Sequence, residues 1–454
     1  MDFKELSFFP APLIKTLLPG PRSQEFLDFQ SVTEGAAVSY PKGMPMALGR
    51  GKGATVEDVD GNIYIDFFGG AGVMNVGHAN PFVLEKVEAQ LPLMTHSLDL
   101  PSRPRRDLVE ELLDVLPAEL SRVFFGGPTG SDAVEAAVKL AKLNTGRKTM
   151  LSFEGAYHGM TAGALSLTSG LAFKEDLFPL VPGVQFVPYA YCYRCAFGRK
   201  PETCDLECAG FVEHRLENPH SGDGRPAALI VEAIQGEGGS IVPPDTFLPR
   251  LREICRKHEV LLIVDEIQAG LCRTGRTFAF EHSSVVPDIT TMSKGLGGLG
   301  FPISGIAYKK ELDTWTAGKH IGTFRGNLLA YTAGAAALCF MREQRLAEHA
   351  EELGGYMLDW LDELAKESEI IGEVRGRGLM LGIELVKNKQ TKDPAPDLAK
   401  KARAACFQRG LLVEIGGHFS NVVRFLPPLV VTKNLARKGV EIFADAMGEV
   451  DKGR

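Results

Sequence analysis

The sequence predicts an α/β protein built on a wound, mostly parallel sheet, with a second and smaller α+β domain. From about residue 80 to 290, short β-branched and apolar runs alternate with amphipathic helical stretches, which is typical of a parallel sheet wrapped by helices. After about residue 327 the pattern changes to long helices followed by strands and a closing helix. The length of 454 residues fits one large and one small domain better than a single domain.

The elements follow in order along the chain. A Pro-rich start leads to a helix near 23–29 and to a β-hairpin over 51–67 that turns at Asp60-Gly61. Six strands of the large sheet are expected at 122–126, 149–153, 184–189, 227–234, 260–266 and 289–293. The clearest helices are expected at 132–146, 246–258, 328–345, 346–366 and 433–448. We therefore expect an N-terminal segment and hairpin over 1–79 that joins the small domain, a large domain over 80–326 and a small domain over 327–454.

Composition excludes several classes of protein. A formal net charge of −7 gives no electrostatic footprint for nucleic acid. No apolar run is long enough to span a membrane. Lys4 and Glu5 stand where a secretory peptide would build its apolar region, so no targeting signal is expected. The expectation is a cytoplasmic enzyme with neither a nucleic acid nor a membrane as its partner.

The strongest chemical signal is a pair of residues at two neighbouring strand ends. Asp265 ends an apolar strand and, once buried there, needs a cationic partner, which is either a protonated pyridine nitrogen or an internal Arg or Lys. Lys294 follows the next strand in a Gly-rich loop, where it is either a surface residue or an amine that forms a Schiff base. The loop 295–300 matches G-x-G-x-x-G, but it lacks the βαβ context of a dinucleotide site.

Two further motifs stand at strand-to-helix turns. Gly130 and Ser131 open a helix, where free N–H groups and a hydroxyl suit a phosphate; an ordinary capped helix with Ser131 or Asp132 as N-cap is the alternative. Tyr157 and His158 follow a Gly turn, where the aromatic ring could stack on a planar cofactor or simply belong to the core.

Two glutamates lie at and just after another strand end. Glu232 and Glu237 stand in the segment 231–239, whose glycines let the backbone bend. Acids at the carboxyl end of a strand are more often functional than structural, although a solvated loop glutamate fits as well.

Four of the eight cysteines crowd into one short segment. Cys192, Cys195, Cys204 and Cys208 have a spacing that could present four thiolates to a structural zinc ion. A loop with free thiols is the alternative, and in neither case do these cysteines take part in the chemistry.

These motifs together resemble the class III, or ω-amino acid, aminotransferases of pyridoxal phosphate fold type I. The resemblance runs from about residue 40 to 450 and rests on G-S-D (130–132), F-x-G-A-Y-H-G (153–159), V-E-x-I-Q-G-E-G-G (231–239), D-E-I-Q-A-G (265–270), S-K-G (293–295) and G-T-F-R-G-N (322–327). Within the family, the chain is most similar to the diaminobutyrate–2-oxoglutarate transaminases. The resemblance implies a large domain with a mostly parallel seven-stranded sheet, and pyridoxal 5′-phosphate as cofactor.

The resemblance also implies roles for residues at matching positions. Lys294 would carry the cofactor and shuttle the proton, and Asp265 would keep the pyridine nitrogen charged. The remaining cofactor contacts would come from Gly130, Ser131, Tyr157, His158, Glu232, Gln268 and Thr323. Thr323 would reach the phosphate of the neighbouring subunit, so a homodimer with shared active sites, or a higher oligomer, is expected.

Substrate binding is implied for one ion pair. Arg424 would bind the α-carboxylate of the oxo acid, and Glu237 would pair with Arg424 while the amino donor is bound. Met160 departs from the GABA and ornithine transaminases, which carry an arginine there that grips a distal carboxylate; Arg325 is a candidate replacement. The expected reaction therefore moves the terminal amine of a diamino or ω-amino acid, 2,4-diaminobutyrate-like, to 2-oxoglutarate or pyruvate. A racemase or epimerase of the same family is the alternative, and a non-catalytic metal-binding protein is a remote one.

Overall fold

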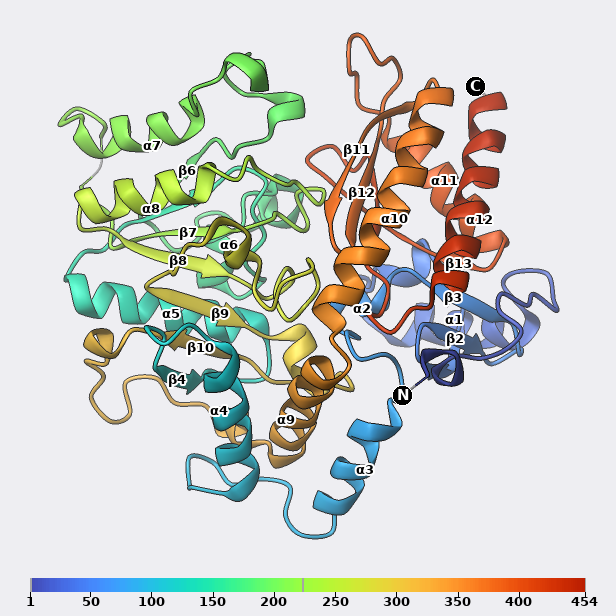
Figure 1. Cartoon of the computed structure of the whole chain (residues 1–454), viewed down its shortest axis with the longest axis horizontal. Helices are drawn as coiled ribbons and strands as arrows, with labels where there is room; N and C mark the ends of the chain where they lie inside the picture. Colours follow the sequence, from blue (N-terminus) through green and yellow to red (C-terminus); the bar gives the residue numbers. More distant parts are fainter. Residues whose placement is uncertain (1, 223, 454) are drawn as a thin grey trace.

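A computed structural model describes residues 2–222 and 224–453. Figure 1 shows two parts side by side, one built around a large sheet and one around smaller sheets with the C-terminal helices. The helices are α1 (Pro21–Thr33), α2 (Gly69–Gly72), α3 (Pro81–Gln90), α4 (Arg103–Val115), α5 (Gly130–Thr145), α6 (Ala162–Leu167), α7 (Glu207–Glu217), α8 (Phe247–Lys257), α9 (Leu328–Glu343), α10 (Leu346–Glu367), α11 (Pro396–Gln408) and α12 (Lys433–Lys452).

The large sheet has seven strands in the order β4-β10-β9-β8-β7-β5-β6. All of its neighbouring strands pair in parallel except β10, which is antiparallel to both β4 and β9. The strands are β4 (Arg122–Phe125), β5 (Met150–Phe153), β6 (Val184–Val187), β7 (Ala228–Glu232), β8 (Leu261–Asp265), β9 (Ile289–Met292) and β10 (Gly305–Tyr308). The predicted mostly parallel seven-stranded sheet is therefore confirmed.

Two four-stranded sheets complete the molecule, in the orders β1-β2-β3-β13 and β11-β12-β15-β14. Their strands are β1 (Leu48–Lys52), β2 (Thr55–Asp58), β3 (Ile63–Asp66), β11 (Ile371–Arg377), β12 (Met380–Leu385), β13 (Leu411–Leu412), β14 (Glu414–Gly416) and β15 (Val422–Phe425). The hairpin expected over 51–67 is formed by β2 and β3, and β1 extends it. β13 pairs in parallel with β3, so the hairpin belongs to the same sheet as a C-terminal strand. We keep domain boundaries near 79/80 and 326/327 as a proposal consistent with this pairing.

Parallel pairing brings the chemical residues to one edge of the large sheet. Glu232 at the end of β7 stands opposite Asp265 at the end of β8, and Asp265 stands opposite Thr291 in β9. Lys294 follows β9 directly. Because carboxyl ends of parallel strands share one edge, residues more than sixty positions apart meet there.

No helix among the described residues is both long and apolar enough to cross a membrane.

Candidate active site

A cavity of about 460 Å³ opens at this edge of the sheet. Its volume falls within the range of small-molecule sites. Its lining includes nine of the predicted site residues, namely Gly130, Ser131, Tyr157, His158, Glu232, Glu237, Asp265, Gln268 and Lys294. The sequence motifs therefore converge on one place.

Lys294 reaches this cavity from a strained position. Its φ of +44° lies in the left-handed region, which is unfavourable for a lysine and is held here by the loop after β9. The Nζ atom donates a hydrogen bond of 2.9 Å to the carbonyl oxygen of Ala71. Burial, aided by the charge of Arg424, lowers the pKa of Lys294 to about 8. A larger fraction of this amine is thus unprotonated, and nucleophilic, near neutral pH than for an ordinary lysine.

Asp265 is held in place on both of its oxygens. One oxygen accepts hydrogen bonds from the backbone N–H of Ile267 and the hydroxyl of Thr291, at 3.1 and 2.8 Å. The other lies 2.7 Å from Nδ1 of His158, whose buried Nε2 has no hydrogen-bond partner. The carboxylate is only 4 % exposed. This arrangement fixes a negative charge against the cavity, with His158 behind it.

Glu232 organises the turn that carries the aromatic wall. Its carboxylate accepts hydrogen bonds from the backbone N–H groups of Tyr157 and Gly236, at 3.0 and 2.8 Å. Burial raises the pKa of Glu232 to about 7. The ring of Tyr157 borders the cavity and packs edge-on against Phe173.

The start of α5 forms another wall. The N-cap is Thr129, so the alternative with Ser131 or Asp132 as the N-cap is wrong. The carboxylate of Asp132 accepts hydrogen bonds from the N–H and hydroxyl of Thr129 instead. A Cβ at Gly130 would come within 3.0 Å of Ile267, so a glycine permits this close packing. The helix N-terminus beside the cavity is favourable for an anion such as a phosphate.

Arg424 lies behind the cavity wall between two carboxylates. Its Nη2 is 2.7 Å from Oε2 of Glu237 and 3.4 Å from Oε2 of Glu414, and Nη1 is 3.5 Å from Oε1 of Gln268. The arginine is 1 % exposed, whereas Glu237 and Glu414 line the cavity. The predicted Glu237–Arg424 pair is present, and an anion could reach the guanidinium once Glu237 moves aside.

The parts of the cavity wall that the sequence did not predict include Glu414, Tyr40 and the carbonyl of Ala71. Burial, with Glu414 and Glu237 nearby, raises the pKa of Tyr40 to about 12. Glu414 carried one usable signal, because it is an acid within an apolar run ten residues before Arg424. Tyr40 and Ala71 stand in an irregular segment and a Gly-rich turn that carry no such pattern.

Some predicted residues lie away from this cavity. Thr323 is exposed, and its carbonyl oxygen accepts a hydrogen bond from His96. Met160 is half exposed, and its backbone N–H donates a hydrogen bond to the hydroxyl of Ser131. Arg325 pairs with Asp99 and is absent from the cavity lining, so it does not replace the missing arginine in the chain as described.

The four clustered cysteines border a separate cavity of about 120 Å³. All are free thiols, and no three of them bring their sulfur atoms within 4.8 Å of one another. Burial raises the pKa of Cys208 to about 12, which opposes the thiolate that zinc requires. The structure thus does not present them as a preformed metal site, and zinc stays a prediction.

The described chain holds one group of possible ligand atoms within that distance, Glu213, Glu217 and His258. The ammonium group of Lys257 already bonds to both glutamates, at 2.8 and 2.6 Å, and supplies the cation there.

The site combines Lys294 with its lowered pKa, the buried Asp265, a helix N-terminus that favours a phosphate, and an arginine paired with a carboxylate. This combination is that of a pyridoxal phosphate enzyme of the transaminase type. Residues 37–447 match the family model of the class III aminotransferases. The chain belongs to this family, and the predictions of an aminotransferase on pyridoxal phosphate fold type I are confirmed.

Known relatives support the same classification. A diaminobutyrate–2-oxoglutarate aminotransferase of Haemophilus influenzae is 44 % identical over 435 residues, which cover 94 % of this chain and 95 % of the relative. A leucine/methionine racemase of Thermococcus litoralis is 38 % identical over 414 residues, covering 90 % and 92 %. A solved ornithine aminotransferase of Toxoplasma gondii, described with pyridoxal phosphate partly occupying its active site, superposes with a TM-score of 0.83 at 29 % identity and covers 95 % of each chain.

The residues present fit the family's cofactor. The orphaned Nε2 of His158, the amine of Lys294 with its lowered pKa and the close packing at Gly130 surround one cavity. Pyridoxal 5′-phosphate is the cofactor of this family, and the prediction of this cofactor is confirmed.

Proposed function

We propose that this protein moves the terminal amino group of a diamino acid of the 2,4-diaminobutyrate type to 2-oxoglutarate or pyruvate. The observation that carries the proposal is the Glu237–Arg424 pair beside Lys294. Arg424 can be neutralised by Glu237 for the amino donor, or bind the carboxylate of the oxo acid when Glu237 moves away. The 44 % identity to a diaminobutyrate–2-oxoglutarate aminotransferase supports this choice of donor and acceptor.

The residues of the chain divide the work around the cofactor. When bound, pyridoxal phosphate supplies an electron sink for the carbon that loses its proton. Lys294 Nζ would accept the proton from the amine-bearing carbon and later donate it again, because a pKa of about 8 suits both steps. Asp265 would hold its negative charge toward the ring nitrogen, and Gly130 and Ser131 would bind the phosphate through the start of α5.

Glu237 and Arg424 let two substrates share the pocket. While the amino donor is bound, Glu237 neutralises Arg424 at 2.7 Å and the terminal amine meets no free guanidinium. When the oxo acid enters, its α-carboxylate takes the place of the Glu237 carboxylate on Arg424. A buried charge is paired in both halves of the reaction, as its desolvation demands.

We propose that the working unit is a homodimer with shared active sites. Exposed apolar side chains gather beside Thr323, in two segments that hydrogen-bond to each other at Ser97–Gly326 and Thr95–Leu328; they are Leu93, Met94, Leu98, Leu100, Ile321 and Phe324. An apolar surface of this kind marks a contact with another protein. Thr323 would then reach the phosphate of the partner subunit.

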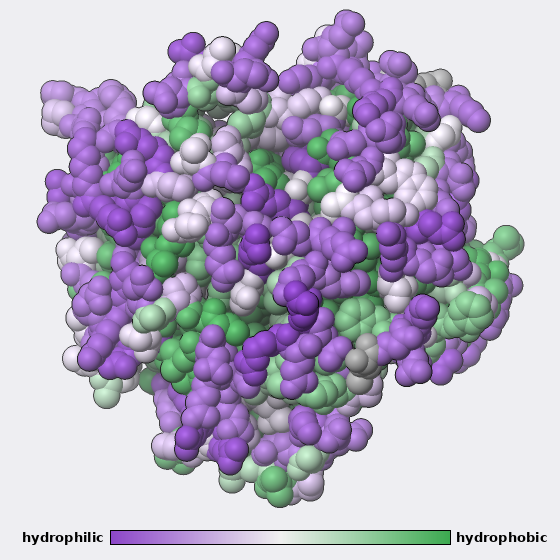
Figure 2. All heavy atoms as spheres, viewed as in Figure 1, coloured by the Kyte–Doolittle hydropathy of each residue, from purple (hydrophilic) through white to green (hydrophobic). Residues whose placement is uncertain are grey.

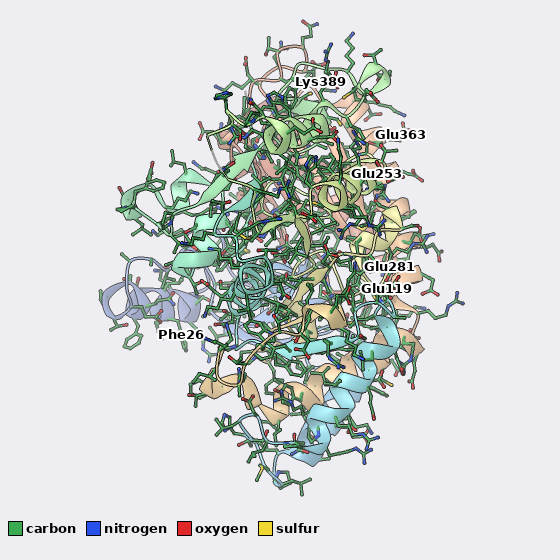
Figure 3. All side chains as sticks on the ribbon, turned by 90° about the vertical axis from the view of Figure 1, so that its left-hand side faces the viewer. Phe26, Glu119, Glu253, Glu281, Glu363 and Lys389 are labelled. Carbon is green, nitrogen blue, oxygen red and sulfur yellow. The ribbon has the colours of Figure 1, made fainter. Side chains whose placement is uncertain are left out.

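Helix α1 gives a second reason to expect a partner subunit. It stands out from the rest of the chain, with Phe26 on it (Figure 3). Phe26, Phe29 and Val32 are 57, 66 and 81 % exposed. Hydrophobic residues also gather at the edge of the molecule where the N-terminal segment lies (Figure 2). A second subunit would cover this face.

A cytoplasmic location is part of the same proposal. All eight cysteines are free thiols, which fits a reducing compartment.

The test of function is oxo acid-dependent consumption of amines by the purified holoenzyme. We expect activity with 2,4-diaminobutyrate to exceed that with GABA, ornithine and β-alanine, and Lys294→Ala to lose both this activity and the visible absorption of the bound cofactor. Full activity in Lys294→Ala would contradict the mechanism.

The racemase remains a second candidate, favoured by the 38 % identity to a leucine/methionine racemase. The family racemases tend to carry aspartate where this chain has Glu237, which favours the transaminase. A chiral assay of single amino acids without any oxo acid separates the two, since a racemase needs no acceptor.

A further inference from the structure

Arg424, behind the cavity wall, forms ion pairs with two carboxylates that line this pocket. Glu237 and Glu414 both lie on its Nη2 atom, at 2.7 and 3.4 Å. The shorter contact is a hydrogen bond, whereas Oε2 of Glu414 is buried and has no hydrogen-bond partner. Glu414 is therefore close enough to Arg424 for an ion pair but makes no hydrogen bond to it.

The charges around Glu414 leave it unmatched. In the donor half of the reaction Glu237 neutralises Arg424, and Lys294 is committed to the cofactor. The guanidinium of Arg403 is close enough to act on Glu414 electrostatically, but it makes no ion pair with it in the described chain. One negative charge is left over on a side chain that is only 13 % exposed.

A buried, unsatisfied carboxylate is costly unless a cation completes it. Glu414 lines the same cavity as Lys294, so a bound substrate can supply that cation. A diamino acid carries two amines, of which one reacts and the other stays an ammonium group. A mono-amine such as 4-aminobutyrate brings only a carboxylate to the far end of the pocket, where Glu414 would repel it.

We propose that Glu414 binds the second, unreacting ammonium group of the donor and so selects diamino acids over ω-amino acids with a single amine. The inference rests on the proposed function and deepens it, because it assigns the choice of donor to one side chain. Burial raises the pKa of Glu414, and an incoming ammonium group opposes that rise and keeps the carboxylate charged.

The test compares two donors that differ only in the second amine. Single-turnover rates of the holoenzyme are measured with 2,4-diaminobutyrate and with 4-aminobutyrate, which has the same four carbons. In Glu414→Gln we expect kcat/KM for 2,4-diaminobutyrate to fall about 10- to 100-fold, as for loss of a charged hydrogen bond, with little change or a gain for 4-aminobutyrate. Glu414→Asp keeps the charge and is expected to recover part of the preference.

A matched control changes the same chemistry at the surface. Glu119→Gln alters an exposed glutamate outside the cavity, labelled in Figure 3, and should leave both rates unchanged. The half-reaction with 2-oxoglutarate is measured in parallel, because Glu414 also lies beside Arg424.

Three results would count against the role of Glu414. An equal fall for both donors would mean that Glu414 only positions Arg424. A change confined to the 2-oxoglutarate half-reaction would mean the same. The third result is that neither diamine is preferred over its mono-amine counterpart, which would overturn the role of Glu414 itself.

The proposed substrate can fail separately. If the wild type does not use 2,4-diaminobutyrate at all, that substrate is wrong, and the role of Glu414 is tested with ornithine against 5-aminopentanoate.

Discussion

The Nζ atom of Lys294 is hydrogen-bonded to the carbonyl oxygen of Ala71, 223 positions earlier in the chain. Ala71 belongs to a Gly-rich turn whose φ angles are positive from Gly69 to Gly72, and it also accepts a hydrogen bond from Gln268. The carbonyl thus holds the amine at the cavity, and this arrangement, together with the pKa of Lys294, leads to the first prediction.

The apoenzyme should combine with pyridoxal phosphate faster as pH rises, with a midpoint near pH 8. The pKa of Lys294 is lowered to about 8, and only the unprotonated amine is a nucleophile. The rate of appearance of the visible cofactor band, followed by stopped flow from pH 6 to 10, measures this. A midpoint near 10.5, the value of an exposed lysine, would show that burial does not act on Lys294 as described.

The same pKa has a consequence for folding. Between pH 8 and 10.5 the unfolded lysine binds the proton that the folded one has lost, so the contribution of Lys294 to stability rises with pH across this window. The Lys294→Met apoenzyme should therefore unfold at a higher urea concentration than the wild type at pH 7, and this difference should disappear near pH 10.

Asp265→Asn should keep the cofactor but react slowly. The neutral amide cannot hold a positive charge on the ring nitrogen, and it replaces the acceptor that faces His158 at 2.7 Å. Loss of one charge-assisted hydrogen bond costs about 1.5–3 kcal/mol, which corresponds to a fall in kcat of roughly 10- to 100-fold. Steady-state kinetics and the absorption spectrum check this, with Asp114→Asn, an exposed aspartate, as control. Unchanged kcat would remove Asp265 from the chemistry.

Glu237→Gln should split the two half-reactions. Arg424 loses its main partner, so the donor step is expected to slow about 10-fold or more, while the KM for 2-oxoglutarate stays the same or falls because the guanidinium is free. Separate single-turnover measurements of the two steps decide the matter. Equal effects on both would argue against exchange of partners at Arg424.

Gly236→Ala should weaken cofactor binding although Gly236 has no side chain. A Cβ at this position, in the turn after β7, would overlap Oε1 of Gln268 in the turn after β8. We expect weaker cofactor binding by about tenfold, measured by equilibrium dialysis, with little loss of thermal stability. Gly210→Ala is the control, because a Cβ there meets no atom within 4 Å.

The sequence was most informative where function and secondary structure coincide. The six strands β4 to β9 all lie within the runs predicted as strands, and two of them, β7 and β8, end in the acids Glu232 and Asp265. β10 was not predicted as a particular strand, because its four residues follow a Gly- and Pro-rich loop and carry no polar residue at a strand end. The helix predicted over 433–448 continues past Gly448 to Lys452, with Val450 buried in its added turn.

The site was predicted less completely than the fold. Motifs marked the residues on the large sheet, but Tyr40 and Glu414 reach the cavity from segments near the two ends of the chain. Their place depends on packing between the small sheets and the large one, which no local pattern encodes. The metal ligation predicted for Cys192 depends in the same way on where four sulfur atoms come to lie, and spacing in the sequence does not fix that.

The parallel pairing of β13 with β3 also sets an order of events during synthesis. The edge of β3 at Ile65 and Asp66 stays unpaired until Leu411 and Leu412 have left the ribosome, and Arg424 emerges later still. Lys294 and Asp265 have left the ribosome before these residues. Until then the cavity that would shield the aldehyde of the cofactor from other amines lacks Glu414 in its wall and Arg424 behind it. A nascent chain therefore gains its cofactor site only in the last stage of translation, and chains truncated before residue 411 should fail to retain the cofactor.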